Sequence, residues 1–280
     1  MYRFVCSLQL FLLVVGLNIS CKGGDALTRF GIDYKKVTLT EIKNYDMVIL
    51  EQDQYMEHEL MALSQSETRV LGYLSLSEVH PSRHYFKKLQ QEDLLGKNES
   101  WGSYYLNLED PRVRAIILES VIPEIMDYKL DGLLLDTIDG VAPYSPRHHM
   151  KDEMVTLIRE IRERYPEATL IQNGGFFLLN QTRNYVDGVM LESVATSYNF
   201  EDQAYALRTD QDYRERVEYI NKYAGLVNGN AYLVDYVNSR EMAARVSERL
   251  DTLSYPYYLS QIQLDSLQMF TKPRALSAIP

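Results

Sequence analysis

Short apolar runs alternate with helical stretches along most of this chain, and this alternation restricts its fold more than any other feature. Such a pattern is typical of parallel strands joined by helical crossovers. Several runs are apolar without an alternation of polar and apolar residues, as expected for strands buried on both faces. The eight runs are residues 30–34, 47–51, 70–76, 132–136, 169–173, 188–192, 231–235 and 257–260. We therefore predict one α/β domain, a (β/α)₈ TIM barrel, with an open doubly wound sheet as the alternative.

Several features place helices and loops between these runs. Residues 150–165 carry apolar side chains at helical spacing, and Ser239 suits the N-cap of a later helix. Asp110, followed directly by proline, should open another helix, and Pro123 should kink or divide it. The insertion 81–110 is too long for a plain connection, so we expect it to form part of the rim above the strands.

The first residues have the layout of a targeting segment. A basic residue precedes an apolar run too short to cross a bilayer, which is typical of a signal peptide over residues 1–20. Ser20 directly precedes Cys21, an arrangement similar to bacterial lipoprotein signals, in which the cysteine becomes the acylated N-terminus. A polar tether over 21–29 would lead to a barrel over 30–280. We predict an exported lipoprotein, anchored to the outer membrane or cell surface; ordinary signal-peptide cleavage would instead yield a soluble periplasmic or secreted protein.

Charge and cysteine content exclude several classes of function. The formal net charge is -10, without a basic cluster, which argues against nucleic acid and against anionic polysaccharides as partners. Both cysteines, Cys6 and Cys21, lie in the leader, so the body has no disulfide, thiolate metal site or cysteine nucleophile. His80 and His84 have the spacing of helical metal ligands, but Pro81 separates them and no third ligand is evident. Neither a metal nor a cofactor is predicted, because no nucleotide-binding fingerprint occurs either.

An internal echo points to the chemistry. Segments 131–137 and 187–193 both open on Asp-Gly, continue through an apolar run, and end on a carboxylate followed by a small hydroxyl residue. The two carboxylates are Asp136 and Glu192, on the fourth and sixth predicted strands; a looser third copy ends on Asp235. In a parallel barrel the carboxyl ends of all strands share one face, where active sites are built. We therefore expect Asp136 and Glu192 on the same rim.

Two carboxyl groups on one rim suit the cleavage of a glycosidic bond. One protonates the leaving oxygen, and the other meets the oxocarbenium-like centre directly or through water. Apolar strand ends favour the raised pKa that a general acid requires. A strand-end acid can also cap a helix or pair with an arginine at the rim, but two acids in echoed contexts favour catalysis.

Other polar and aromatic side chains fall on the same predicted strand ends. Tyr73, Ser75 and Glu78 end the third strand, and Asn173 ends the fifth. Such groups could hydrogen-bond sugar hydroxyls. The aromatic residues that could stack on sugar faces are Tyr73, Trp101, Tyr198 and Tyr236.

An ordered set of motifs carries a resemblance to a known family. The motifs are Tyr73-Leu74-Ser75, Asp131-Gly132 with Asp136 and Asp139-Gly140, Gln172-Asn173-Gly174, Asp187-Gly188 with Glu192, and Val234-Asp235-Tyr236. Together they resemble glycoside hydrolase family 114, the endo-α-1,4-polygalactosaminidase-like TIM barrels, and in particular its poorly characterised bacterial and archaeal branch. The resemblance implies that Asp136 is the nucleophile and Glu192 the acid/base of a retaining mechanism. The implied substrate-binding residues are Tyr73, Ser75, Glu78, Asp139, Asn173, Asp235 and Tyr236.

The expected activity is therefore hydrolysis of an amino-sugar polysaccharide of the galactosamine type, by an exported enzyme. The negative net charge suits a partly deacetylated, cationic polymer. Two alternatives stay open at this point. One is a surface glycan-binding barrel without activity, and the other is a lyase or isomerase that uses the same acids as proton shuttles.

Overall fold

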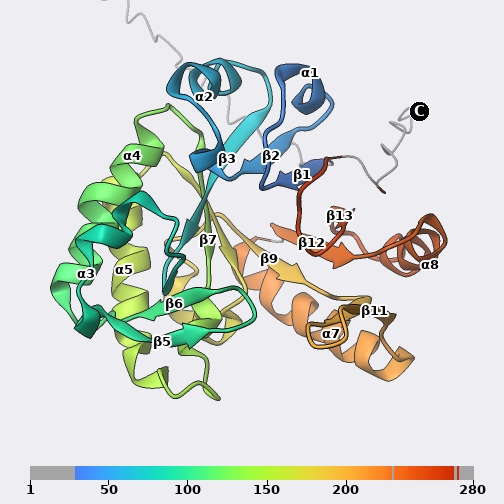
Figure 1. Ribbon diagram of the computed structural model, residues 1–280. Coiled ribbons are helices and arrows are strands. Elements are labelled where there is room, and N and C mark those ends of the chain that lie inside the picture. Colours follow the sequence, from blue (N-terminus) through green and yellow to red (C-terminus); the bar gives the residue numbers. More distant parts are fainter. Residues whose placement is uncertain (1–28, 229, 268–269, 271–280) are drawn as a thin grey trace, which may run out of the picture.

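A computed structural model of the chain describes residues 29–228, 230–267 and 270 (Figure 1). Its main sheet has eight strands, all parallel to their neighbours. In sheet order they are β1 (Phe30–Asp33), β2 (Met47–Leu50), β3 (Arg69–Ser75), β7 (Gly132–Asp136), β8 (Thr169–Asn173), β9 (Gly188–Glu192), β12 (Ala231–Tyr236) and β13 (Tyr257–Ser260). All eight predicted strands are present, within one residue at each end.

The two edge strands, β1 and β13, meet and nearly close the sheet into a barrel. The Tyr34 backbone N–H, just past β1, donates to the carbonyl of Leu264, just past β13, at 2.6 Å. Beside it the Leu267 N–H donates to the Asp33 carboxylate at 2.9 Å. The prediction of a (β/α)₈ barrel is confirmed, and the open doubly wound alternative is excluded, because its edges would lie far apart.

Helices connect successive strands on the outside of the barrel (Figure 1). They are α1 (Leu39–Ile42), α2 (Glu57–Ser64), α3 (Pro111–Ile116), α4 (Ile122–Met126), α5 (Lys151–Arg164), α6 (Leu179–Thr182), α7 (Asp210–Ala224) and α8 (Arg240–Leu250). Ser239 caps α8 through its hydroxyl, and Asp110 caps α3 through its carboxylate, as predicted. Pro123 divides its helix: a π-helical turn over Ile117–Val121 separates α3 from α4, since proline lacks the N–H that would continue the α-helical pattern.

The Asp-Gly pairs that open the two repeated segments, 131–137 and 187–193, connect neighbouring strands. The Asp131 carboxylate accepts the Val70 N–H at the start of β3, and the Asp187 carboxylate accepts the Leu170 N–H in β8. Each bond measures at most 2.8 Å and satisfies a strand N–H on the neighbouring strand. The glycine that follows lets the strands approach closely: a Cβ at Gly132 would lie 1.9 Å from the Thr169 carbonyl oxygen.

Alternate residues of each strand face the barrel interior. Leu134 of β7, Ile171 of β8 and Met190 of β9 belong to one compact cluster inside the barrel. Their neighbours along each strand face the helices and form a second, larger core. Because side chains alternate with a period of two, the residues two positions further on also face inward. These residues are Asp136, Asn173 and Glu192, so the polar site lies directly above the apolar barrel interior.

Two excursions extend the rim at the carboxyl ends of the strands. The insertion after β3 forms a three-stranded antiparallel sheet, with β4 (Glu78–Val79), β5 (Leu94–Asn98) and β6 (Ser103–Leu106). After β9 the chain forms a hairpin of β10 (Thr196–Asn199) and β11 (Ala204–Leu207). The expectation that 81–110 contributes to the rim is confirmed, and both excursions lie at the same end of the barrel (Figure 1).

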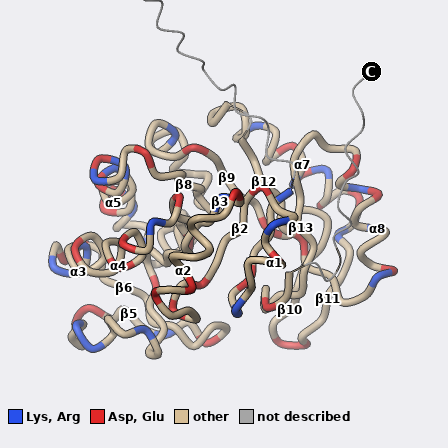
Figure 2. The backbone as a smooth tube through the Cα atoms, turned by 90° about the horizontal axis from the view of Figure 1, so that it is seen from above, with Lys and Arg blue, Asp and Glu red and all other residues tan. Residues whose placement is uncertain are grey.

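Lys and Arg positions are scattered over the helices and loops of the described residues and do not gather on one face (Figure 2). Within the same residues, none of the helices has the length and apolar character that crossing a membrane requires. The predicted signal peptide, the acylated Cys21 and nearly all of the tether lie outside the described residues.

Candidate active site

The side-chain amide of Asn173 forms hydrogen bonds with both predicted catalytic acids. The Asn173 Nδ2 atom donates to Asp136 Oδ1 at 2.8 Å and to Glu192 Oε1 at 2.7 Å. Because both bonds end on one nitrogen, these two oxygens lie no more than about 5.5 Å apart, the two bonds taken end to end. The acids come from β7 and β9, and Asn173 comes from β8 between them. The sheet order therefore brings the three side chains together.

Two tyrosines complete the hydrogen bonding of the acids. The Tyr73 hydroxyl donates to Asp136 Oδ2 at 2.8 Å, and the Tyr236 hydroxyl donates to Glu192 Oε2 at 2.6 Å. Burial, and next the negative charge of Asp136, raise the pKa of Tyr73 well above its usual value. Burial and the charge of Glu192 do the same to the pKa of Tyr236. Both phenols therefore stay protonated and act as donors.

The environment of Glu192 favours its protonated form. Burial is the largest cause, and the nearby charge of Asp136 adds to it; together they raise the pKa of Glu192 above its usual value. The hydrogen bonds from Tyr236 and Asn173 act in the opposite direction and only partly offset the increase. Glu192 is thus the carboxyl of the pair that is suited to hold a proton.

The small hydroxyl residues that follow the two acids have a strained backbone. Thr137 has φ 62° and Ser193 has φ 56°, in the left-handed region that side chains other than glycine rarely adopt. The Thr137 hydroxyl accepts the backbone N–H groups of Leu76 and Ser77 at 3.1 and 2.9 Å. Thr137 thereby ties the end of β7 to the loop after β3, and this tie orients the chain at Asp136.

Asp235 does not reach this cluster, which corrects the expectation that it lines the sugar subsite. Its carboxylate is 0% exposed and accepts the N–H groups of Val194, Ala195 and Thr196, together with the Thr196 hydroxyl. The register of β12 explains this: Val234 pairs with Glu192 and faces inward, so Asp235 faces outward. Asp235 therefore holds the loop that follows Glu192.

Three further predicted residues lie at the rim without touching the acids. The Ser75 hydroxyl donates to the Glu78 carbonyl at 2.7 Å, and the Glu78 carboxylate accepts the Asn98 amide at 3.1 Å, within the three-stranded sheet. Asp139 accepts the Gly175 N–H at 3.2 Å, at the loop after β8. In this structure all three brace loops around the site.

Comparison of the sequence with known families now identifies the class of protein. The chain matches glycoside-hydrolase family GH114 over residues 23–272. This range includes the whole barrel, both acids, Asn173 and the two tyrosines that donate to the acids. This chain belongs to glycoside hydrolase family GH114. The resemblance found in the motifs and the predicted hydrolase class are both confirmed. No curated protein matches the chain.

Solved structures share the fold of this GH114 protein. The glycoside hydrolase domain of PelA from Pseudomonas aeruginosa has a TM-score of 0.74 at 20% identity, over 86% of this chain and 97% of that domain. Ega3 from Aspergillus fumigatus, in a complex with galactosamine, has a TM-score of 0.67 at 13% identity, over 86% and 93%. An α-amylase from Geobacillus thermoleovorans, complexed with acarbose, reaches 0.51 at 12% identity, over 85% and 69%.

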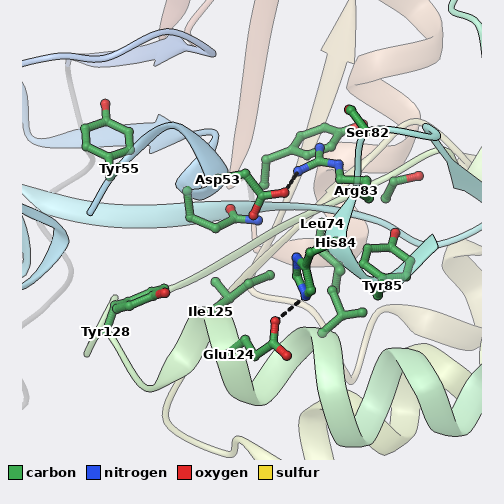
Figure 3. A pocket seen from close by; sticks show the side chains of 14 residues that line it. Asp53, Tyr55, Leu74, Ser82, Arg83, His84, Tyr85, Glu124, Ile125 and Tyr128 are labelled. Atoms are coloured by element: carbon green, nitrogen blue, oxygen red, sulfur yellow. Dashed lines mark hydrogen bonds and ion pairs between the residues drawn. The ribbon is translucent and has the colours of Figure 1, made fainter. Parts of the chain in front are cut away.

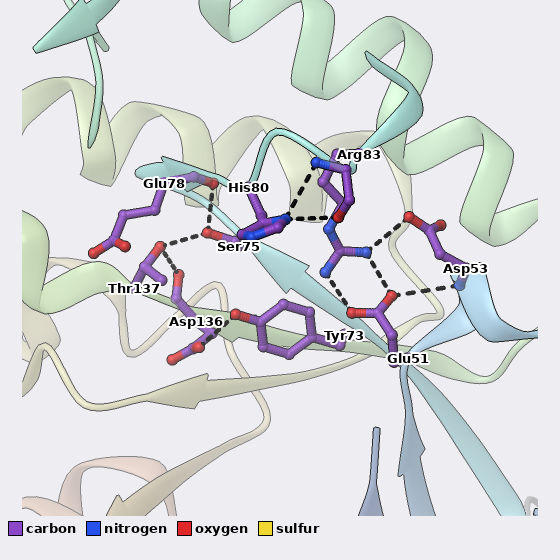
Figure 4. Close-up of polar contacts among 10 residues, drawn as sticks. Glu51, Asp53, Tyr73, Ser75, Glu78, His80, Arg83, Asp136 and Thr137 are labelled. Atoms are coloured by element: carbon purple, nitrogen blue, oxygen red, sulfur yellow. Dashed lines mark hydrogen bonds and ion pairs between the residues drawn. The ribbon is translucent and has the colours of Figure 1, made fainter. Parts of the chain in front are cut away.

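Sequence reasoning missed an ion-pair network behind Tyr73 in this GH114 site. Arg83, from the insertion, donates to the Glu51 carboxylate at 2.5 Å and to Asp53 at 2.9 Å (Figure 4). Its guanidinium lies 5.7 Å from the centre of the Tyr73 ring, and the Tyr34 ring packs edge-on against the same ring, with the ring centroids 5.0 Å apart. These residues hold the phenol that reaches Asp136. The position of Glu51 at the end of a strand was the available signal, but Arg83 comes from an insertion with no periodic pattern.

A pocket of about 430 Å³ lies between β3 and α4, and both Arg83 and Tyr73 line it (Figure 3). His84 points into it and pairs with Glu124, while His80 contacts the Ser82 hydroxyl at 2.7 Å. The two histidines therefore have separate partners. Among the described residues, no group of three or more His, Cys, Asp or Glu is arranged to hold a metal ion.

Proposed function

We propose that this GH114 protein is an exported hydrolase that cleaves galactosamine-containing polysaccharides with retention of anomeric configuration, with Asp136 as nucleophile and Glu192 as acid/base. The observation that carries the proposal is the pair of hydrogen bonds from Asn173 to Asp136 and Glu192. It keeps two of the carboxylate oxygens no more than about 5.5 Å apart, which supports the close spacing of carboxyl groups in retaining pairs, about 5–5.5 Å, over the wider spacing of about 6.5–9.5 Å in inverting pairs.

The reaction then proceeds in two displacements. In the first, an Asp136 oxygen bonds to the anomeric carbon while the glycosidic bond breaks, and Glu192 gives its proton to the leaving oxygen. In the second, Glu192 takes a proton from water, the water oxygen bonds to the anomeric carbon, and the bond to Asp136 breaks. The raised pKa of Glu192 suits the first step, and the loss of the Asp136 charge in the covalent intermediate favours an ionised Glu192 for the second.

Two observations support an amino-sugar polymer as substrate. Ega3, which shares the fold, was crystallised with galactosamine. The net charge of -10 attracts a polymer that carries free ammonium groups. Partly deacetylated galactosamine polymer should therefore be cleaved faster than its fully acetylated form, and the preference should weaken as salt is added.

The stereochemistry of the first product tests the proposal directly. We expect proton NMR of a fresh digest to show new reducing ends that first have the configuration of the cleaved bond and then mutarotate. Initial appearance of the opposite anomer would contradict the retaining mechanism. An unsaturated sugar at the cleaved end would instead identify a lyase, and binding without new reducing ends would identify a glycan-binding barrel.

Tyr236→Phe should shift the pH profile of the reaction. The general acid must be protonated, so the rate falls as pH rises through the raised pKa of Glu192. Because the Tyr236 hydrogen bond lowers that pKa, its removal should move the alkaline limb to higher pH, by up to about one unit. The measurement is kcat against pH. Tyr34→Phe is the matched control, since Tyr34 donates no hydrogen bond to Glu192 in the described structure; an equal shift there would contradict the prediction.

Export and anchoring are part of the same proposal and rest on the sequence of residues 1–29. The composition around Cys21 supports cleavage before the cysteine and acylation of its amino group. Mass spectrometry of the mature N-terminal peptide would test this, because an unmodified peptide that begins elsewhere would contradict the anchor while leaving the hydrolase proposal intact.

A further inference from the structure

Two rim hairpins meet at their tips. Trp101 lies in the turn between β5 and β6, and Phe200 lies in the turn between β10 and β11. Their ring centroids are 5.2 Å apart, with the planes at 75°. The first hairpin belongs to the insertion after β3 and the second follows β9, and in the sheet β7 and β8 lie between those two strands. The contact therefore links the two sides of the rim segment that carries Asp136 and Asn173.

A line of aromatic rings leads from this contact toward the site. Phe200 contacts Tyr198 at 5.0 Å, and Tyr198 contacts Tyr205 at 4.8 Å, both edge to face. Tyr198 and Tyr205 pack against the cluster inside the barrel, and Tyr236 is a member of that cluster. The line of rings thus leads from the exposed tips to the cluster that contains Tyr236, the tyrosine that donates to Glu192.

Both tip rings are exposed despite their mutual contact. Trp101 is 55% exposed and Phe200 is 42% exposed. Two exposed aromatic rings in contact form an apolar surface at the rim, and such contiguous surfaces suit ligand binding. Acidic residues are near them in the sequence: Glu99, which pairs with Lys97 at 2.9 Å, precedes Trp101 by two positions, and Glu201 and Asp202 follow Phe200. Aromatic faces bind the C–H faces of sugars and attract cations, so rings flanked by carboxylates suit a sugar that carries an ammonium group.

We propose that Trp101 and Phe200, here called the aromatic bridge, form a subsite that binds a sugar of the polysaccharide outside the catalytic centre. The proposal rests on the proposed function and deepens it: the bridge takes a unit of the same amino-sugar chain, beyond the sugar that reacts at Asp136. Chains long enough to reach the bridge gain this contact, and a disaccharide does not.

The chain has a single tryptophan, so fluorescence reports on the bridge directly. The experiment uses Asp136→Asn protein, which binds without turnover, titrated with galactosamine disaccharide and octasaccharide. We expect the octasaccharide to move the Trp101 emission to shorter wavelength, because stacking removes water from the indole, and the disaccharide to leave it unchanged. Isothermal calorimetry on the same samples measures binding independently of the fluorophore.

Kinetics of single variants provide the second readout. Trp101→Ala and Phe200→Ala should each raise KM for the octasaccharide about tenfold while kcat stays within a factor of about two. Trp101→Phe should recover much of the loss because it keeps an aromatic face. Leu95→Ala is the matched control: Leu95 is an exposed apolar residue, 38% accessible, on the same hairpin. Its KM should not change, and melting curves of all four variants should match the wild type.

The outcomes separate this proposal from the proposed function. Octasaccharide binding seen by calorimetry with no change in Trp101 emission, or an unchanged KM in both alanine variants, would overturn the bridge. If the octasaccharide shifts the Trp101 emission but the wild-type protein releases no sugar from the polymer, the aromatic bridge is supported and the proposed hydrolase function is overturned. An equal rise of KM in Leu95→Ala would also overturn the bridge, because it would show a general effect of the hairpin.

Discussion

Asp136→Asn should reduce kcat on galactosamine polymer by at least about 10³-fold, since it removes the atom that bonds to the anomeric carbon. Asparagine keeps the shape of the side chain and can still contact Tyr73 and Asn173, so the loss reflects chemistry rather than folding. The measurement is the initial rate of release of reducing ends. A rate within about tenfold of the wild type would remove Asp136 as the nucleophile.

Glu192→Gln tests the other half of the pair and should behave differently. We expect kcat on the polymer to fall about 10²–10⁴-fold, because the leaving oxygen receives no proton. A substrate with an acidic phenol as leaving group needs no such proton, so formation of its glycosyl-enzyme should stay fast. Azide should restore turnover of that substrate by replacing the activated water. The double variant should be little worse than Asp136→Asn alone, because residues that act as a unit are not additive.

Asp235→Ala should cause the largest loss of stability among the acids of the echo. It leaves three buried N–H groups, those of Val194, Ala195 and Thr196, without their acceptor. Each unsatisfied buried donor is costly, and we expect the free energy of unfolding to fall by about 3–5 kcal/mol. Urea denaturation measures the change, and kcat should fall as well, because the loop begins directly after Glu192.

Glu192→Gln is the control for this stability prediction. The neutral glutamine avoids the burial cost and the repulsion from Asp136 that disfavour a charged Glu192, so the unfolding free energy of this variant should equal or exceed that of the wild type. The unfolding free energy of Asp235→Asn should lie between those of Asp235→Ala and Glu192→Gln. Its amide oxygen still accepts hydrogen bonds, but its amide nitrogen faces other donors. If Asp235→Ala were as stable as Glu192→Gln, the buried carboxylate would not hold the loop.

The strand framework could be predicted because the signal is local. The runs that became β7, β8, β9 and β13 end where the structure ends them, and turn residues such as Asp131 and Asp187 bound two of them. Burial on both faces produces continuous apolar runs in the sequence, and crossover helices show their own period. Asp136 and Glu192 followed from the same reasoning, since strand order places their carboxyl ends on one rim.

The roles of neighbouring residues could not be predicted in this way. Every side chain of β12 is buried, so hydropathy gives no alternation that separates Asp235 from Tyr236. Only the pairing of Val234 with Glu192 decides that Tyr236 faces the site and Asp235 faces the loop behind it. A shift of one residue in register would exchange the two.

The sequence by itself determined eight strands with helical crossovers and the two acids at the strand ends, because periodicity and turn chemistry are properties of adjacent residues. The contact between β1 and β13 decided that the sheet closes into a barrel. Tertiary structure decided what surrounds those acids. Three contacts join segments far apart in the chain: the hydrogen bonds from Asn173 to the two acids, the packing of Arg83 against Tyr73, and the contact of Trp101 with Phe200. Such contacts depend on register and on the path of rim insertions, which no local pattern records.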